Sequence, residues 1–185
     1  MHTRRFIGFL LGAWFALAAG VAGVWATATR VASSLAKAPP AEAAKALEEA
    51  GPELTGHIFR FAGTEVGRAV LETGGWLEVA LLFALLFTLF IQNYSRAATV
   101  MMAVVFLAAV GAHLLLTPQI VASGRLLDFR DGDFGVMERA RLTNVQLLHW
   151  VLLGVRLALG LGVTAILVRR SSVSGMRRRR DDVDL

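Results

Sequence analysis

Hydrophobic residues fall in four long runs along the chain, and polar residues gather between them. The runs cover residues 6–27, 76–93, 97–117 and 147–168. A helix needs about 20 apolar residues to cross about 30 Å of hydrocarbon. None of the runs alternates between polar and apolar positions as a barrel strand does, so each run predicts a helix. The pattern therefore predicts an all-α integral membrane protein with four transmembrane helices.

The first outer loop, residues 28–75, is expected to be partly helical. Pro40 precedes an alanine-rich segment at 41–50 that predicts a short helix. Residues 53–75 predict a second helix, which either lies on the membrane surface or extends span two.

The other two connections differ in length. The one at residues 92–97 is so short that the helices it joins are expected to be antiparallel neighbours, as in a four-helix bundle. The second outer loop, residues 118–146, is expected to turn at Asp131 and Gly132. A helix capped by Asp133 then runs into span four.

Basic residues are concentrated on one side of the predicted membrane. They precede span one, lie in the short turn and follow span four: Arg4, Arg5, Arg96, Arg169, Arg170 and Arg177–Arg180. This distribution predicts that both termini are cytoplasmic. We expect one membrane domain over residues 1–170 and a short disordered tail over 171–185. In the rival interpretation, the first run is a signal peptide cleaved after Ala26-Thr27-Ala28.

Composition narrows the classes of function. Residues are 56% hydrophobic, the formal net charge is +5 and cysteine is absent. The lack of cysteine excludes disulfides, thiolate metal sites and thiol catalysis. Because the positive charge flanks membrane spans, we expect no nucleic-acid partner. The run Arg177–Arg180 is expected to bind anionic lipid head groups.

Small residues recur at every fourth position in two spans. Span one has Gly8, Gly12, Ala16 and Gly20, and span four has Gly154, Ala158 and Gly162. Such stripes let helix backbones approach each other in lipid. We expect them to mediate packing between the spans, and the alternative is a contact between two copies of the protein.

Four ionisable residues interrupt the apolar runs and are the candidate site. Glu78, His113 and His149 come from three different spans, and all fall within about 10 Å of the outer boundary by helical rise. Arg156 lies deeper, on the same helical stripe as His149. A polar stripe in a membrane helix should face the bundle interior. We expect Arg156 to form an ion pair with Glu78, the only carboxylate inside an apolar run.

Several hypotheses for this cluster remain open at the level of sequence. In the first hypothesis, the cluster is a hydrogen-bonded network that fixes the register of the helices. In the second, His113, His149 and Glu78 form a copper, zinc or iron site. In a third hypothesis His113 and His149 are axial ligands of haem b. In the last, the cluster lines an outward-facing pocket for a transported or sensed ligand. Catalysis is not expected, because no serine lies in any apolar run beside a base.

Three segments resemble a family of small four-span bacterial membrane proteins of unknown function. They are RRFIGFLLGAWFALAAG (4–20), LTPQI (116–120) with Arg125 after it, and LHWVLLGVRLALG (148–160). This family is similar to the eukaryotic group called transmembrane protein two-hundred-and-five, and the resemblance implies a fold but no reaction. The family usually has a small polar residue after the histidine of the last span, where this chain has Leu152 and Leu153. The chain is also loosely similar to copper-resistance membrane proteins, through histidines near the outer ends of spans.

The sequence thus predicts a non-catalytic inner-membrane protein, either an accessory subunit or a ligand-handling protein with an outward-facing polar cluster. The alternative is a protein that binds haem b or copper through His113 and His149. Expected partners are the lipid bilayer and either a second copy of the chain or a larger membrane complex.

Overall fold

The computed structural model describes residues 2–38, 40–46, 51–129 and 133–181, and these are helical apart from short connections. Four of its helical segments are long and apolar enough to cross a membrane. The prediction of an all-α protein with four membrane-length helices is therefore confirmed.

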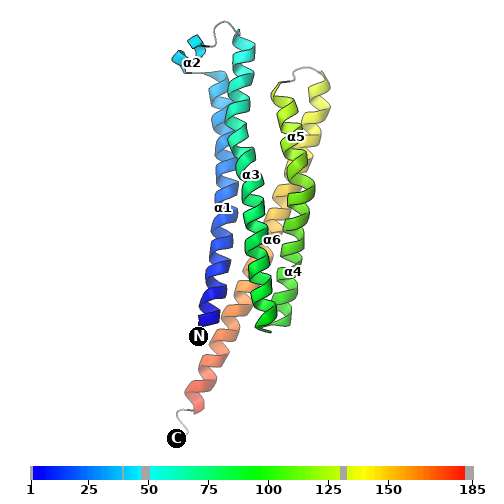
Figure 1. Cartoon of the computed structure of the whole chain (residues 1–185). Helices are drawn as coiled ribbons and strands as arrows, with labels where there is room; N and C mark the ends of the chain where they lie inside the picture. Colours follow the sequence, from blue (N-terminus) through cyan, green and yellow to red (C-terminus); the bar gives the residue numbers. More distant parts are fainter. Residues whose placement is uncertain (1, 39, 47–50, 130–132, 182–185) are drawn as a thin grey trace.

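The helices are longer than the apolar runs that predicted them. They are α1 (His2–Lys37), α2 (Ala41–Ala46), α3 (Pro52–Ile91), α4 (Arg96–Gly111), the π-helical turn η2 (Ala112–Leu116), α5 (Thr117–Asp128) and α6 (Asp133–Asp181). In Figure 1, α1 and α3 lie side by side, α4 and α5 follow one another beside α6, and the start of α1 and the end of α6 lie at the same end of the molecule.

Two alternatives for the first outer loop are settled by α3. This helix begins at Pro52, which occupies a position where a missing N–H costs nothing. It continues without a break through Gly74 and Gly75 to Ile91. Residues 53–75 therefore extend span two rather than forming a separate surface helix. The short helix predicted at 41–50 is present as α2, and its last four predicted residues lie outside the described part of the chain.

The second outer loop is shorter than predicted. The apolar run predicted that span three ends at Thr117, directly before Pro118. Instead the helix widens into the π turn η2 and then continues as α5 to Asp128. A π turn accommodates a local disruption without ending the helix, and the hydroxyl of Thr117 donates to the carbonyl of Ala112 at 3.5 Å. The turn predicted at Asp131-Gly132 lies outside the described residues, and α6 begins at Asp133.

The end of the chain also differs from the expectation. We predicted a disordered tail over residues 171–185, whereas α6 continues to Asp181. Arginine and methionine have high helix propensity, so the run that follows Gly175 extends the helix of span four. Residues 182–185 lie outside the described part.

Close helix contacts use other glycines than the predicted stripes. An added Cβ atom would meet nothing within 4 Å at Gly8, Gly12, Gly20 or Gly154, so these positions face outward. By contrast, a Cβ at Gly63 of α3 would come within 2.7 Å of the backbone of Ala32 on α1. Among the glycines of the predicted stripes, only Gly162 meets a neighbouring helix, at the side chain of Met101. The expectation that both stripes mediate packing between spans was wrong for these outward-facing glycines.

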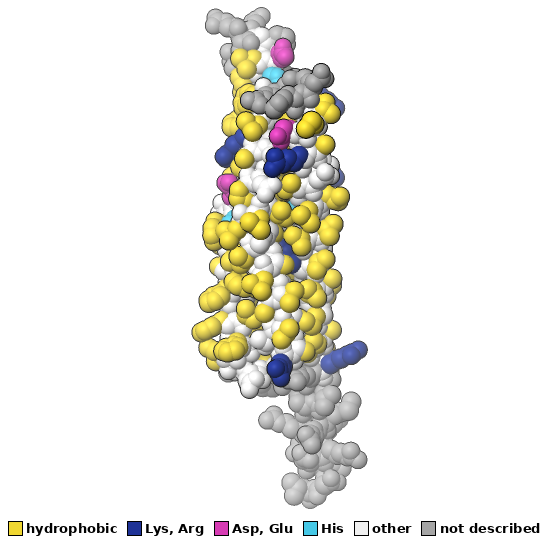
Figure 2. All heavy atoms as spheres, turned by 90° about the vertical axis from the view of Figure 1, so that its right-hand side faces the viewer, with side chains coloured by type: hydrophobic (Ala, Val, Ile, Leu, Met, Phe, Trp, Pro, Cys, Tyr) yellow, Lys and Arg dark blue, Asp and Glu magenta, His cyan; other side chains and the backbone are white. Residues whose placement is uncertain are grey.

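The apolar core lies in the half of the molecule near the two termini. Its largest fully buried side chains include Trp14, Leu85, Met102 and Val163, which come from α1, α3, α4 and α6. Hydrophobic side chains also cover the outside of this half, and charged side chains lie toward the α2 end and, at the other end, at the edge of the described part (Figure 2). An apolar surface around an apolar core is what a lipid environment requires.

Candidate functional site

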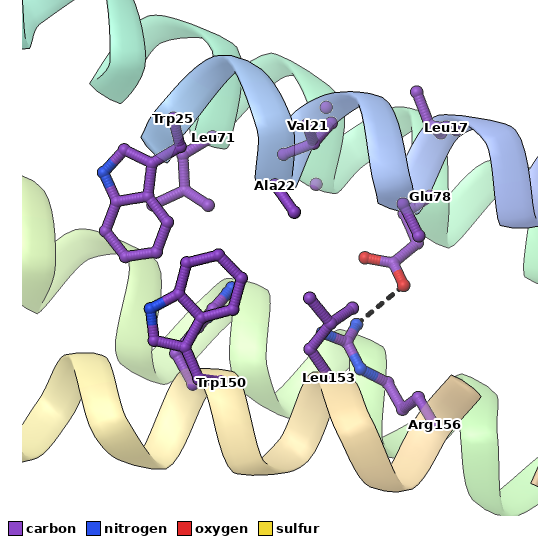
Figure 3. A pocket seen from close by; sticks show the side chains of 13 residues that line it. Leu17, Val21, Ala22, Trp25, Leu71, Glu78, Trp150, Leu153 and Arg156 are labelled. Atoms are coloured by element: carbon purple, nitrogen blue, oxygen red, sulfur yellow. Dashed lines mark hydrogen bonds and ion pairs between the residues drawn. The ribbon is translucent and has the colours of Figure 1, made fainter. Parts of the chain in front are cut away.

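An ion pair between α6 and α3 occupies the centre of the candidate site. Nη1 of Arg156 lies 2.8 Å from Oε1 of Glu78, and the two side chains are 2% and 13% exposed. The indole N–H of Trp14 on α1 donates to the same carboxylate oxygen at 3.1 Å. Three helices therefore meet at one carboxylate, and the ion pair predicted from the sequence is confirmed (Figure 3).

The polar stripe of span four faces the interior as predicted. Arg156, His149 and Gly160 are buried, whereas Val155 and Leu161 on other faces of α6 are exposed. A charged side chain is costly at this depth in a membrane, so the stripe can be buried only because Glu78 compensates the guanidinium. The pair thus fixes the rotation of α6 against α1 and α3.

His149 lies about two helical turns before Arg156 on α6, toward the α2 end, and contacts aromatic rings. Its ring packs edge-on against Trp25 of α1, with ring centroids 5.9 Å apart. Trp25 in turn stacks on Trp150, with centroids 5.0 Å apart and planes inclined by 15°. The side chain of His149 is buried, and its Nδ1 atom has no hydrogen-bond partner. An unpaired buried polar atom costs free energy, so this nitrogen needs a partner that the helices do not provide.

A small cavity between α1, α3 and α6 connects these residues. It extends from the Trp25–Trp150 stack to the Arg156–Glu78 pair, and His149 contributes to its lining (Figure 3). The rest of its wall is apolar, formed by residues such as Val21, Leu71 and Leu153. The volume of the cavity is about 30 Å³, which leaves room for about two water molecules.

Comparison of the chain with protein-family models, curated proteins and solved structures found no match.

His113 lies outside the lining of the cavity that the other predicted site residues share. It lies in the π turn η2, where its ring packs edge-on against Trp76 with centroids 4.5 Å apart. Its Nδ1 atom lies directly against Gly75 of α3, is buried and has no hydrogen-bond partner. His113 does not contribute to the cavity that His149 lines. Similar depth along the membrane normal was the reason to group the two histidines, but depth does not specify which way a helix faces.

This arrangement does not favour the metal and haem hypotheses. Within the described ranges, no three histidine, cysteine or acidic side chains converge closely enough to hold a metal ion. His113, His149 and Glu78 therefore do not form the predicted three-ligand site. The haem hypothesis requires two histidines facing one wide space, whereas only His149 faces the cavity, and that cavity has room for about two waters.

A second polar network, which the sequence analysis missed, joins α3 to α5 near the α2 end. Arg68 forms an ion pair with Asp128 at 2.7 Å, and both side chains are 7% exposed. Asp128 also accepts a hydrogen bond from Thr64 at 3.1 Å, and its backbone carbonyl lies 2.5 Å from Nδ1 of His57. Glu65 links Arg68 to Arg125, the latter through contacts of its Nε atom at 3.1 and 3.2 Å.

The sequence contained one weak signal for this network. Glu65 and Arg68, and likewise Arg125 and Asp128, are opposite charges three residues apart, which is the spacing of neighbours on one helix face. Both pairs lie in segments that were predicted to be outer loops. One member of each pair, Arg68 and Asp128 respectively, is buried, because α3 and α5 both extend beyond the apolar runs.

Proposed function

We propose that the protein is a multi-pass protein of the bacterial inner membrane, an antiparallel bundle with both termini in the cytoplasm. Four membrane-length helices support this topology. The basic residues that flank them lie where the positive-inside rule requires, and the carboxylates of α3 and α5 lie toward the other end. Membership of the small four-span family that the sequence resembles is part of the same proposal.

The proposed activity is non-catalytic binding of a small molecule in the cavity between α1, α3 and α6. One observation carries this proposal: the buried Nδ1 of His149 has no partner and belongs to a side chain that lines the cavity. An apolar pocket with a few convergent polar groups is the usual form of a small-molecule site. Arg156 and Glu78 satisfy each other, so they close the inner end of the site rather than attracting a charged ligand.

The lining specifies the class of ligand. Most of the wall is apolar, the outer end is aromatic and one nitrogen is available for a hydrogen bond. This combination suits a small neutral molecule with one hydroxyl or amine group and an apolar body. Trp150 is 38% exposed, so its side chain can rotate away from the cavity and admit a ligand larger than two water molecules.

Nuclear magnetic resonance of protein labelled with ¹⁵N-histidine tests the proposal, with phenol as the probe. Phenol combines one hydroxyl with a ring that can stack on Trp25 or Trp150. The expected result is a saturable shift of the His149 ring nitrogens, with the His113 resonances unchanged. Leu153→Trp, which fills the cavity, should abolish the shift, and Val155→Trp on an exposed face of α6 should preserve it.

Two results would argue against the proposed site. One is a shift that rises linearly with phenol and affects His113 and His149 equally, because that describes partitioning into detergent or lipid. The other is an undiminished, saturable shift of His149 in the Leu153→Trp variant, since binding would then occur outside this cavity.

A further inference from the structure

A groove lies at the opposite end of the molecule, close to the two termini. It is formed by Gly8 and Leu11 of α1, by Tyr94 in the turn before α4, and by Thr164, Leu167 and Val168 of α6. Its volume is about 210 Å³, much larger than the cavity beside His149. Gly8 contributes open space, because an added Cβ there would meet nothing within 4 Å. The groove is apolar along most of its length and is bordered by the outward-facing surface of α1.

Three exposed arginines flank this groove, one for each segment that forms it. Arg5 is one turn before Gly8 on α1, Arg96 follows Tyr94 by two residues, and Arg169 follows Val168 directly. The sequence has no acidic residue at 1–41, 79–127 or 139–180, the ranges that contain all three segments. No carboxylate from these ranges can neutralise the arginines, so this rim has a positive potential of its own.

We propose that the groove binds one anionic phospholipid. An acyl chain occupies the space beside Gly8 and Leu167, and the phosphate contacts Arg5, Arg96 and Arg169. Apolar grooves on the lipid-facing side of a bundle suit acyl chains, and guanidinium groups bind phosphate through paired N–H donors. The site is distinct from the cavity at His149 and does not depend on it. It is also distinct from the Arg177–Arg180 run, which attracts anionic membranes without defining a single lipid position.

Native mass spectrometry of the full chain, with added phosphatidylglycerol or phosphatidylcholine of equal chain length, tests this site. We expect one phosphatidylglycerol to be retained per chain, with a preference over phosphatidylcholine of about tenfold or more, given three arginines near the phosphate. The variant carrying Arg5→Gln, Arg96→Gln and Arg169→Gln should lose this preference. Replacement of the four arginines 177–180 by glutamine should leave it intact.

A groove-filling variant separates the acyl-chain contact from the charge. Gly8→Leu occupies the groove and should lower retention of both lipids by about tenfold, the loss expected when a few buried methylene contacts are removed. Gly20→Leu is the matched control, because Gly20 is equally open but does not line the groove. It should retain the lipid as the unmodified chain does.

Three outcomes would overturn the proposal. In the first, preference for phosphatidylglycerol is lost with the Arg177–Arg180 substitutions but not with the flanking arginines, which locates recognition in the tail. In the second, Gly8→Leu and Gly20→Leu lower retention equally, which shows a general effect on α1. In the third, Gly8→Leu converts a dimer into a monomer without changing retention, so that a second copy covers this face.

Discussion

Arg156 on α6 and Glu78 on α3 are separated by 78 residues in the chain, yet their side chains meet at 2.8 Å in the apolar part of the bundle. Each charge makes the burial of the other tolerable. The contact also determines which faces of α3 and α6 oppose each other, and Trp14 connects the same carboxylate to α1. The cavity beside His149 depends on this arrangement, since Glu78 and Arg156 form one of its ends.

Breaking the ion pair should destabilise the bundle strongly. Arg156→Leu leaves Glu78 without its cationic partner, and Glu78→Gln leaves the guanidinium uncompensated. Either change should cost about 3–5 kcal/mol, as for other buried pairs that lose one member. The double variant Arg156→Leu/Glu78→Leu should recover most of this loss, because it buries no charge. Reversible unfolding in mixed micelles measures these free energies, with the exposed Arg141→Leu as a control. Equal stability of the single variants and the unmodified chain would contradict a stabilising role for the pair.

Trp14→Phe should reduce stability through the loss of one hydrogen bond and some packing. The indole N–H donates to a charged group, and such bonds contribute about 1.5–3 kcal/mol. Trp14 is also completely buried, so the smaller ring leaves a void. Trp76→Phe is the matched control, because Trp76 is 60% exposed and its replacement should change stability by less than about 0.5 kcal/mol. A double-mutant cycle with Glu78→Gln should show non-additive free energies. Strict additivity would mean that the indole and the carboxylate do not interact.

Two glycines of α6 should respond in opposite ways to alanine. An added Cβ at Gly160 would clash with the ring of Trp14 and come within 3.1 Å of Phe15, whereas Gly154 has open space. Gly160→Ala should therefore cost about 1–3 kcal/mol from overpacking. Gly154→Ala should be neutral or stabilise the helix by up to about 1 kcal/mol. Thermal unfolding followed by circular dichroism distinguishes the two, and a similar effect at both positions would show that Gly160 is not at a helix contact.

The network between α3 and α5 should contain one strong and one weak contact. Arg68→Met removes the partner of Asp128 where both side chains are buried, so a loss of about 3–5 kcal/mol is expected. Arg125→Met removes a partner of Glu65 at a position that is 48% exposed, and water replaces that contact at a cost of about 0–1 kcal/mol. Hydrogen exchange of the α3 and α5 amides should increase in the Arg68 variant and remain near its original rate in the Arg125 variant. Comparable increases of the exchange rates in both variants would mean that the two contacts contribute equally to stability, contrary to this prediction.

The sequence determined the membrane-length helices and the central pair for the same physical reason. Apolar runs long enough to cross a bilayer have few alternatives to a helix, because their backbone groups must be satisfied within the segment. A charge on such a helix needs an opposite charge, and Glu78 was the only carboxylate within the apolar runs available to Arg156. Helical periodicity then specified that His149 and Gly160 face the same side.

The tertiary structure alone decided which polar residues share a site. Helical rise gave His113 and His149 the same depth, but the rotation of each helix placed His113 against Gly75 and His149 in the cavity. The π turn before Pro118 allowed span three to continue, which brought Asp128 to Arg68. Rotation and helix length depend on contacts between segments distant in the chain, so a local pattern of polar and apolar residues does not specify them.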